Sequence, residues 1–187
     1  LLSALSERAR IVDAVAPRFV PIAKAAEQGR ATSGEILQLV LGGFLKTVVR
    51  PGDVGGVGGL HVDPVEVRAR VAENLPGLAA AAAFGRLKIP VAVGWDLASR
   101  SREPCLEPME IRGRNGHRFF RFDEDVVSVF ASRFTTAARL GSALDIPSGK
   151  LRKMLKTAGA KPVATRAEIG LDMYRVEDLP EFCGMPE

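Results

Sequence analysis

The stretch TAARLGSALDIPSGKLRKMLKTAGAK, residues 136–161, has the pattern of two short helices joined by a tight turn. A first helix is expected over Thr136–Gly141 and a turn over Asp145–Ser148, because Asp, Pro and Ser are frequent turn residues. A second helix is expected over Gly149–Thr157, with Gly159 where helices commonly end. This order of elements predicts a helix-turn-helix.

The second of these helices has two different faces. Apolar residues recur at the spacing of one helix face, which predicts a buried stripe: Leu151, Met154, Leu155 and Ala158. The remaining arc carries basic residues that no acidic residue interrupts: Lys150, Arg152, Lys153 and Lys156. Such a face can lie along phosphates and reach base edges in a major groove. A solvated surface helix carries similar charges, so it is the helix-turn-helix context that favours DNA contact.

A second pattern recurs along the chain. Two apolar positions of a short strand, an acidic residue and an amphipathic helix appear at residues 60–65, 120–126 and 174–179. The acidic residue suits a helix N-terminus, where it accepts hydrogen bonds and meets the helix dipole. Paired helices and strands precede each copy, so the sequence predicts three units ordered helix, turn, helix, strand, wing, strand, helix. The alternative is one domain in which these stretches are unrelated.

The expected fold class is α+β, mainly helical with small β-hairpins. In the first two units the expected helices are 19–28, 34–43, 78–86 and 91–100, and the expected strands are 45–50, 59–62, 109–112 and 119–122. The expected boundaries are a leading helix within 1–18 (Leu2–Val15, ended by Pro17), a first winged unit at 19–76, a second at 77–134 and a third at 135–187.

The wing of the second unit is rich in positive charge. Asn115-Gly116 between extended segments is a strong hairpin signal, and the segment 112–121 contains no acidic residue. It is expected to contact phosphates or a minor groove through Arg112, Arg114, Asn115, His117 and Arg118, with Arg121 adding to its charge. Arg100 and Arg102 extend the same basic surface. The alternative is a solubilising loop.

The first unit differs from the other two. Its basic and acidic residues balance, and its second helix is apolar nearly all round at Ile36–Leu41, which predicts burial inside the domain or against a partner. We therefore expect a structural or protein-contact module. The glycine-rich tip Gly52–Gly59 lacks the Lys-Ser/Thr of a P-loop and precedes a strand, so nucleotide binding is not expected.

No constellation of catalytic residues is found. Cys105, Cys183, His61 and His117 have no metal-ligand spacing. The acidic run Asp123–Asp125 is interpreted as a helix start, and Trp95 as a core residue. A non-catalytic protein without cofactor or metal is expected.

Composition sets the broad class. Hydrophobic residues make up 47% and aromatics 6%, which argues against disorder and favours small helical modules. The net charge is +4 and the isoelectric point about 9.4, which permits an anionic partner. Two distant cysteines do not suggest a disulfide scaffold, and no apolar run is long enough for a bilayer. A soluble, cytoplasmic and nucleoid-associated protein from a GC-rich bacterium is expected.

The helix-turn-helix stretch resembles the MerR and excisionase class of winged domains. The match lies in an Ala-x-x-Leu-Gly helix, a Pro-Ser turn and a Tyr-Arg-Val-x-Asp-Leu strand: Ala138, Leu140, Gly141, Pro147, Ser148, Leu151, Leu155, Gly159, Tyr174, Arg175, Val176 and Leu179. This resemblance implies that Ser148, Lys150, Arg152 and Lys153 enter a major groove, with Lys161 and Arg166 near the wing.

The tandem array is also similar to the C-terminal region of TniQ-family transposition proteins, although that family's Cys/His zinc motif is absent. The similarity implies double-stranded DNA and other recombination or transposition proteins as partners, or else a transcriptional regulator. The alternative is a protein-protein adaptor built on degenerate winged helices.

Overall fold

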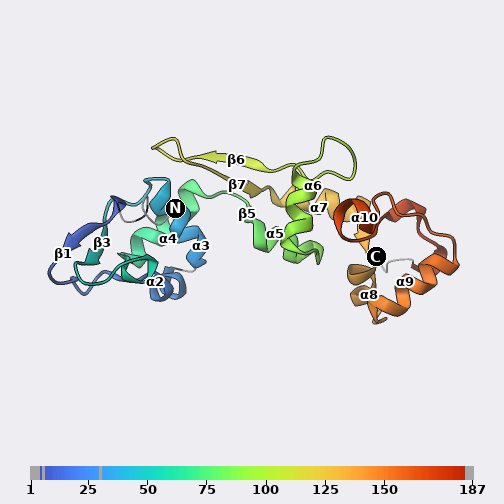
Figure 1. Ribbon diagram of the computed structural model, residues 1–187, viewed down its shortest axis with the longest axis horizontal. Helices are drawn as coiled ribbons and strands as arrows, with labels where there is room; N and C mark the ends of the chain where they lie inside the picture. The colour runs from blue at the N-terminus through green and yellow to red at the C-terminus, as the bar shows by residue number, and fades with distance from the viewer. Residues whose placement is uncertain (1–4, 6, 30, 184–187) are drawn as a thin grey trace. The chain divides into compact units, whose positions relative to one another are not determined.

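The structure is a computed structural model, and it describes residues 5, 7–29 and 31–183 (Figure 1). It has the expected mixed α+β character, with helices connected by small sheets. By their internal contacts the residues form two units, Leu1–Pro76 with Glu110–Arg121 and Gly77–Met109 with Phe122–Glu187. The buried hydrophobic residues gather in three clusters, one centred on the first unit and two on the second. The division into three winged units stays a prediction.

In the first unit, helices α2, α3 and α4 accompany a four-stranded sheet of order β1-β3-β4-β2. Strand β4 is antiparallel to both β3 and β2, whereas β1 is parallel to β3. The bounds are β1 Arg10–Val12, β2 Val20–Pro21, α2 Ile22–Gly29, α3 Ser33–Leu41, β3 Val48–Pro51, a 3-10 helix Val57–Gly59, β4 His61–Val62 and α4 Pro64–Asn74.

The expected leading helix over Leu2–Val15 is wrong in its second half. Arg10–Val12 form strand β1, which pairs with Val49–Pro51 on the edge of the sheet. Ile11 and Val12 are β-branched and suit a strand, but only the distant partner strand decides between the two conformations. The beginning of the predicted helix, residues 2–4 and 6, lies outside the described residues.

Local capping explains where α3 and α4 begin. The Thr32 hydroxyl accepts a hydrogen bond from the Glu35 amide (3.2 Å), and the Glu35 carboxylate accepts one from the Thr32 amide (2.9 Å). Asp63 accepts from the Val65 amide at 2.9 Å, and Pro64 occupies the first helical position, as the sequence predicts. The apolar helix α3 is largely buried within the unit, with Ile36 and Leu39 at 0% exposure.

The hairpin of β6 (Met109–Arg112) and β7 (Arg118–Phe122) matches the expected wing strands, but its tip is engaged. The Arg114 amide donates to the Gly42 carbonyl (2.9 Å), and the Asn115 side-chain amide donates to the Leu41 carbonyl (2.6 Å). These carbonyls belong to the end of α3, where helical partners run out. A Cβ at Gly113 would lie 2.5 Å from the Gly42 Cα, so the close approach requires glycine.

The expectation that Arg121 adds to the charge of the wing surface is wrong, because this residue is only 2% exposed. Its guanidinium pairs with Glu35 at 3.1 Å and donates to the Pro76 carbonyl at 2.8 Å. Burial by itself raises the pKa of Glu35. The hydrogen bonds from the Thr32 amide and from Arg121, together with the Arg121 charge, lower this pKa by a larger amount, so it lies below its ordinary value. Arg121 therefore holds β7 to the start of α3 and is withdrawn from solvent.

The second unit contains two helix pairs and the helix that joins them. The bounds are β5 Leu78–Ala79, α5 Ala80–Leu87, α6 Val91–Ala98, α7 Glu124–Arg133, β8 Phe134–Thr136, α8 Ala137–Ala143, α9 Ser148–Thr157, α10 Arg166–Ile169, β9 Met173–Arg175 and 3-10 helices Val176–Asp178 and Glu181–Cys183. Around α5 and α6, Phe84 packs edge-on against Phe122 (centroids 5.1 Å apart) and Trp95 (5.6 Å). Trp95 is 36% exposed, so it covers the core and is not enclosed by it.

A short strand precedes each helix pair, which the sequence analysis missed. Strands β2, β5 and β8 lead directly into α2, α5 and α8. Each lies beside a strand that comes later in the chain than its helix pair: β2 beside β4, β5 beside β7, and β8 beside β9. A strand of two or three residues is too short to show an alternating pattern, and tertiary pairing alone defines it.

The third copy of the strand-acid-helix pattern departs from the prediction. The strand at Met173 is present, but a 3-10 helix over Val176–Asp178 follows it in place of an amphipathic α-helix. In the place of a first wing strand there is a single bridge, Ala164 with Met173, and the short helix α10. Thr165 and Glu168 form a capping box that favours this helix.

We predict that Glu35→Ala destabilises the chain by about 3–5 kcal/mol, because it removes the carboxylate that pairs with the buried Arg121 guanidinium. Thr32→Ala is the matched control, since it removes the cap of the same helix and should cost about 1 kcal/mol. Urea unfolding at pH 7 measures both. Because the pKa of Glu35 is lowered, its contribution is present above the ordinary value of 4.5 and is lost as the pH falls through the folded-state pKa. Equal losses in the two variants would contradict the role of the ion pair.

Candidate nucleic-acid interface

The predicted helix-turn-helix is formed by α8 and α9. Leu140, Leu151 and Leu155 are each 0% exposed and pack with Tyr174 in the third hydrophobic cluster. The turn places Asp145 at φ 53°, and a Cβ on Gly141 would lie 2.4 Å from the Ile146 carbonyl oxygen. The turn therefore closes against the helix only because position 141 has no side chain, which accounts for the Leu-Gly of the motif.

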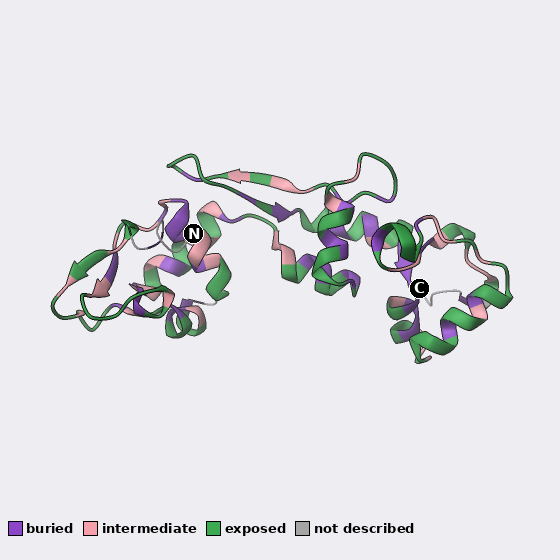
Figure 2. Ribbon diagram, in the orientation of Figure 1, coloured by how far each residue is buried: buried purple, intermediate pink, exposed green. Residues whose placement is uncertain are grey.

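The outer face of α9 is cationic and open to solvent (Figure 2). Lys150, Arg152, Lys153 and Lys156 are all exposed. Among the residues that the structure describes, none of them has an acidic partner within ion-pair distance. The predicted buried stripe is confirmed at Leu151 and Leu155, whereas Met154 is half-buried and Ala158 is exposed beyond the end of the helix.

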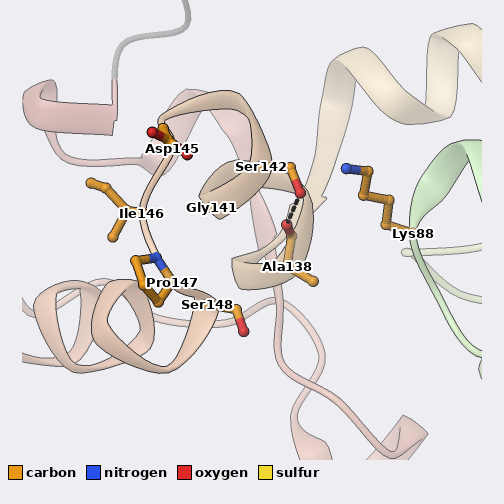
Figure 3. Close-up of a pocket in the computed structure, with 8 residues that line it drawn as sticks. All are labelled: Lys88, Ala138, Gly141, Ser142, Asp145, Ile146, Pro147 and Ser148. Carbon is orange, nitrogen blue, oxygen red and sulfur yellow. Dashed lines mark hydrogen bonds between the residues drawn. The ribbon is translucent and has the colours of Figure 1, made fainter.

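A cavity of about 530 Å³ opens beside the start of α9 (Figure 3). Its lining comprises Lys88, Ala138, Gly141, Ser142, Asp145, Ile146, Pro147 and Ser148. Ser148 is the first residue of α9, and no side chain caps that helix. The Lys88 side chain extends from the end of α5 toward Ser142 on α8. The opening thus combines a lysine with an uncapped helix N-terminus, both of which favour negative charge.

A second cavity, of about 310 Å³, shares Lys88 and Ala138 with the first. Arg152 of α9 and Arg166 of α10 also line it, together with Asp172. The Asp172 carboxylate accepts a hydrogen bond from the Arg166 amide at 2.9 Å. Burial raises the pKa of the nearby Tyr174. The negative charge of Asp172 raises this pKa as well, whereas the positive charge of Arg152 lowers it. Three cationic side chains from three different elements therefore surround one opening.

Lys88 is the basic residue of this surface that the sequence analysis did not select. It ends α5 in a left-handed conformation, with φ 52°. Nothing in Arg86-Leu87-Lys88 distinguishes this lysine from any other at a helix end. It lines an opening with residues of α8 that lie about 50 positions further along the chain, and periodicity along the chain does not encode such a neighbourhood.

The basic residues of the wing are exposed, but a neighbouring carboxylate compensates part of their positive charge. Arg112, Arg114, His117 and Arg118 are exposed. Glu110, just outside the segment considered for the wing, pairs with Arg112 at 2.7 Å and approaches Arg118 at 3.6 Å. The Asn115 side-chain amide donates a hydrogen bond to the Leu41 carbonyl, so it stabilises the position of the hairpin tip within the first unit. The wing is therefore a weaker cationic surface than its sequence suggests.

The other residues predicted to contact DNA differ in their exposure and in whether they have an acidic partner. Arg102 pairs with Glu168 at 2.9 Å, and the half-buried Arg100 has a buried Nε without a hydrogen-bond partner. Lys161 and Arg166 are exposed after α9. The structure brings Arg152 and Arg166 to one cavity, while Arg112, Arg114 and Arg118 belong to the first unit.

Residue types that bind metal ions are scattered in the part of the chain that the structure describes. Within it, no group of three or more His, Cys, Asp or Glu residues could hold a metal ion. Cys105 is exposed and Cys183 is buried, and both are free thiols; burial raises the pKa of Cys183. The His61 Nδ1 donates to the Gly59 carbonyl at 2.9 Å, so this imidazole is used locally.

Comparison with known proteins finds no relative. No protein-family model, curated protein or solved structure matches this chain. Across the described ranges, no helix combines the length and apolarity that crossing a bilayer requires.

We predict opposite effects for two glycine substitutions in the α8–α9 pair. Gly141→Ala should destabilise the protein by about 1–3 kcal/mol, because its methyl group meets a backbone oxygen. Gly149→Ala, in open space on α9, should be neutral or stabilising by up to about 1 kcal/mol. Thermal unfolding followed by circular dichroism measures both. A Gly141→Ala protein as stable as the parent chain would show that the turn does not close as described.

Proposed function

We propose that this chain is a non-catalytic double-stranded DNA-binding protein and that α9 is its principal contact. The observation that carries the proposal is the exposed face of Lys150, Arg152, Lys153 and Lys156 on the second helix of a helix-turn-helix. These side chains have no acidic partner within the described residues, so phosphates would meet positive charge that is not already neutralised.

The surroundings of α9 extend this surface. In a docked complex, α9 lies in the major groove with its N-terminal residues nearest the bases, as second helices of this motif do. Lys88 and Arg166, which line the cavities beside α9, would then bind phosphates on the flanking backbone. The wing arginines would add a secondary contact, limited by their pairing with Glu110.

For the biological process, the proposal rests on sequence resemblance alone. Similarity to MerR and excisionase domains and to TniQ-like proteins supports an accessory or targeting role in transposition or recombination, or transcriptional regulation. Such roles require DNA binding and positioning of partner proteins, and they need no catalytic residues in this chain.

Reversing three charges on α9 should abolish most of the DNA affinity. The triple variant Lys150→Glu, Arg152→Glu, Lys153→Glu is expected to bind a mixed-sequence duplex at least about tenfold more weakly, with a salt slope shallower by roughly 2 to 3, since each lost phosphate contact contributes about 0.9. Fluorescence anisotropy between about 50 and 200 mM salt gives both quantities.

The matched control for this variant is Arg10→Glu, Arg18→Glu, Lys24→Glu, which changes the net charge equally at exposed positions of the first unit. It should keep the parent slope. If the two variants lose affinity equally, binding depends on net charge alone and α9 is not the contact.

Lys88→Ala tests the cavity beside α9. We expect the salt slope to fall by about 0.9, the contribution of one phosphate, with no change of sequence preference. Lys46→Ala, an exposed lysine of the first unit, is the control and should leave the slope unchanged. An unaltered slope for Lys88→Ala would place the phosphate backbone away from this opening.

A further inference from the structure

A groove runs along α7, within the second unit and built from residues that the DNA-binding proposal does not use. Its volume is about 320 Å³. The apolar lining comprises Cys105, Val126, Val129, Phe130 and Phe134, and the charged lining comprises Glu103, Glu107, Asp125 and Arg133.

The apolar part of this α7 groove is open to solvent. Val126 is 37% exposed and Val129 57%, and their spacing of three residues places them on one face of the helix. Phe130 and Phe134 lie beneath at 5% and 3% exposure, with ring centroids 5.0 Å apart. Exposed apolar side chains around a hollow are typical of binding surfaces and not of solvated helix faces.

The uncompensated charge around the groove is negative. Glu103 is engaged by Arg133 at 2.5 Å and by Arg175 at 2.7 Å, and the hydrogen bond from Arg133 lowers the pKa of Glu103. Arg175 also pairs with Glu177 at 3.5 Å, so the charges of Arg133 and Arg175 are balanced by Glu103 and Glu177. Glu107 and Asp125 are exposed, and neither has an ion-pair partner among the residues described. This charge is opposite to that of α9 and to the +4 of the whole chain.

We propose that the α7 groove binds a basic amphipathic helix of a partner protein. Apolar side chains of that helix would enter between Val126 and Val129, and its Lys or Arg residues would meet Glu107 and Asp125. Helix-in-groove recognition of this kind uses anchors spaced one turn apart.

Other occupants fit the groove less well. Its negative rim repels nucleic acid and anionic lipid. Its volume is near the lower end of the range of about 300–1,000 Å³ for small-molecule pockets. Apart from the Glu103–Arg133 ion pair, the charged groups that line it are two carboxylates, not converging donors and acceptors.

Cys105 provides a reporter for occupancy. Its thiol is exposed and lines the groove, whereas Cys183 is 2% exposed and serves as the slow internal reference. The full chain is alkylated with iodoacetamide in the presence of synthetic amphipathic helical peptides of about four turns. One peptide has leucines on one face and lysines on the other, and its partner has glutamates in place of the lysines.

The lysine peptide should slow alkylation of Cys105 roughly tenfold at about ten times its dissociation constant, and the glutamate peptide should not slow it. Val129→Lys should remove the protection, while Val65→Lys, at a 78% exposed valine of the first unit, should retain it. The double variant Glu107→Lys, Asp125→Lys leaves the apolar floor intact and should transfer protection to the glutamate peptide.

Several results would overturn the proposal: no protection by the lysine peptide, equal protection by both peptides, or unchanged protection in Val129→Lys. Protection that rises with chain concentration in the absence of peptide would instead assign the groove to a second copy of this chain. The α9 charge-reversal variant should keep the peptide response, so failure of DNA binding and failure of this groove are separable.

Discussion

The burial of Leu151 and Leu155 against Leu140 and Tyr174 is the contact on which the proposed function depends. Once these leucines are withdrawn from water, the helical repeat directs Lys150, Arg152, Lys153 and Lys156 to the other side of α9. Removing two leucine side chains from solvent contributes about 1.5–3 kcal/mol each, which is large compared with the small repulsion among exposed lysines. The apolar contact therefore orients the helix, and the cationic surface is its consequence.

The basic side chains of α9 and those of the β6–β7 hairpin have different surroundings. Around α9 the cations are exposed without acidic partners in the described residues, and Lys88 and Arg166 join them at neighbouring cavities. In the hairpin, one of the cations is used by the fold, because Arg121 is buried against Glu35. The uncharged Asn115 beside it supplies a hydrogen bond to the end of α3. Glu110 takes up part of the charge that remains on Arg112 and Arg118. Four Lys or Arg residues on α9 and four in the hairpin thus differ in their capacity to attract a polyanion.

The second unit presents surfaces of opposite sign that suit different partners. The α9 side carries an exposed basic face, and we propose it as the contact for duplex DNA. The α7 groove has exposed valines and two carboxylates without an ion-pair partner among the residues that the structure describes, a combination that suits a basic helix and disfavours nucleic acid. A chain that binds DNA by one surface and a protein by the other would connect the two, which is the task expected of an accessory factor in recombination.

Local sequence determined most helices and their starts. Asp63, Asp123 and the Thr32–Glu35 box cap the helices that they precede, because capping needs only neighbouring backbone groups. The amphipathic pattern of 149–157 likewise predicts α9 and its exposed face. Tertiary structure alone decided the strands β1, β2, β5 and β8, which are two or three residues long and exist through partners distant in sequence. It also buried Arg121, engaged Asn115 and brought Lys88 to α8. The reason is physical: a periodic pattern specifies which face of a segment avoids water, whereas the partner of an individual side chain depends on which segments meet in space.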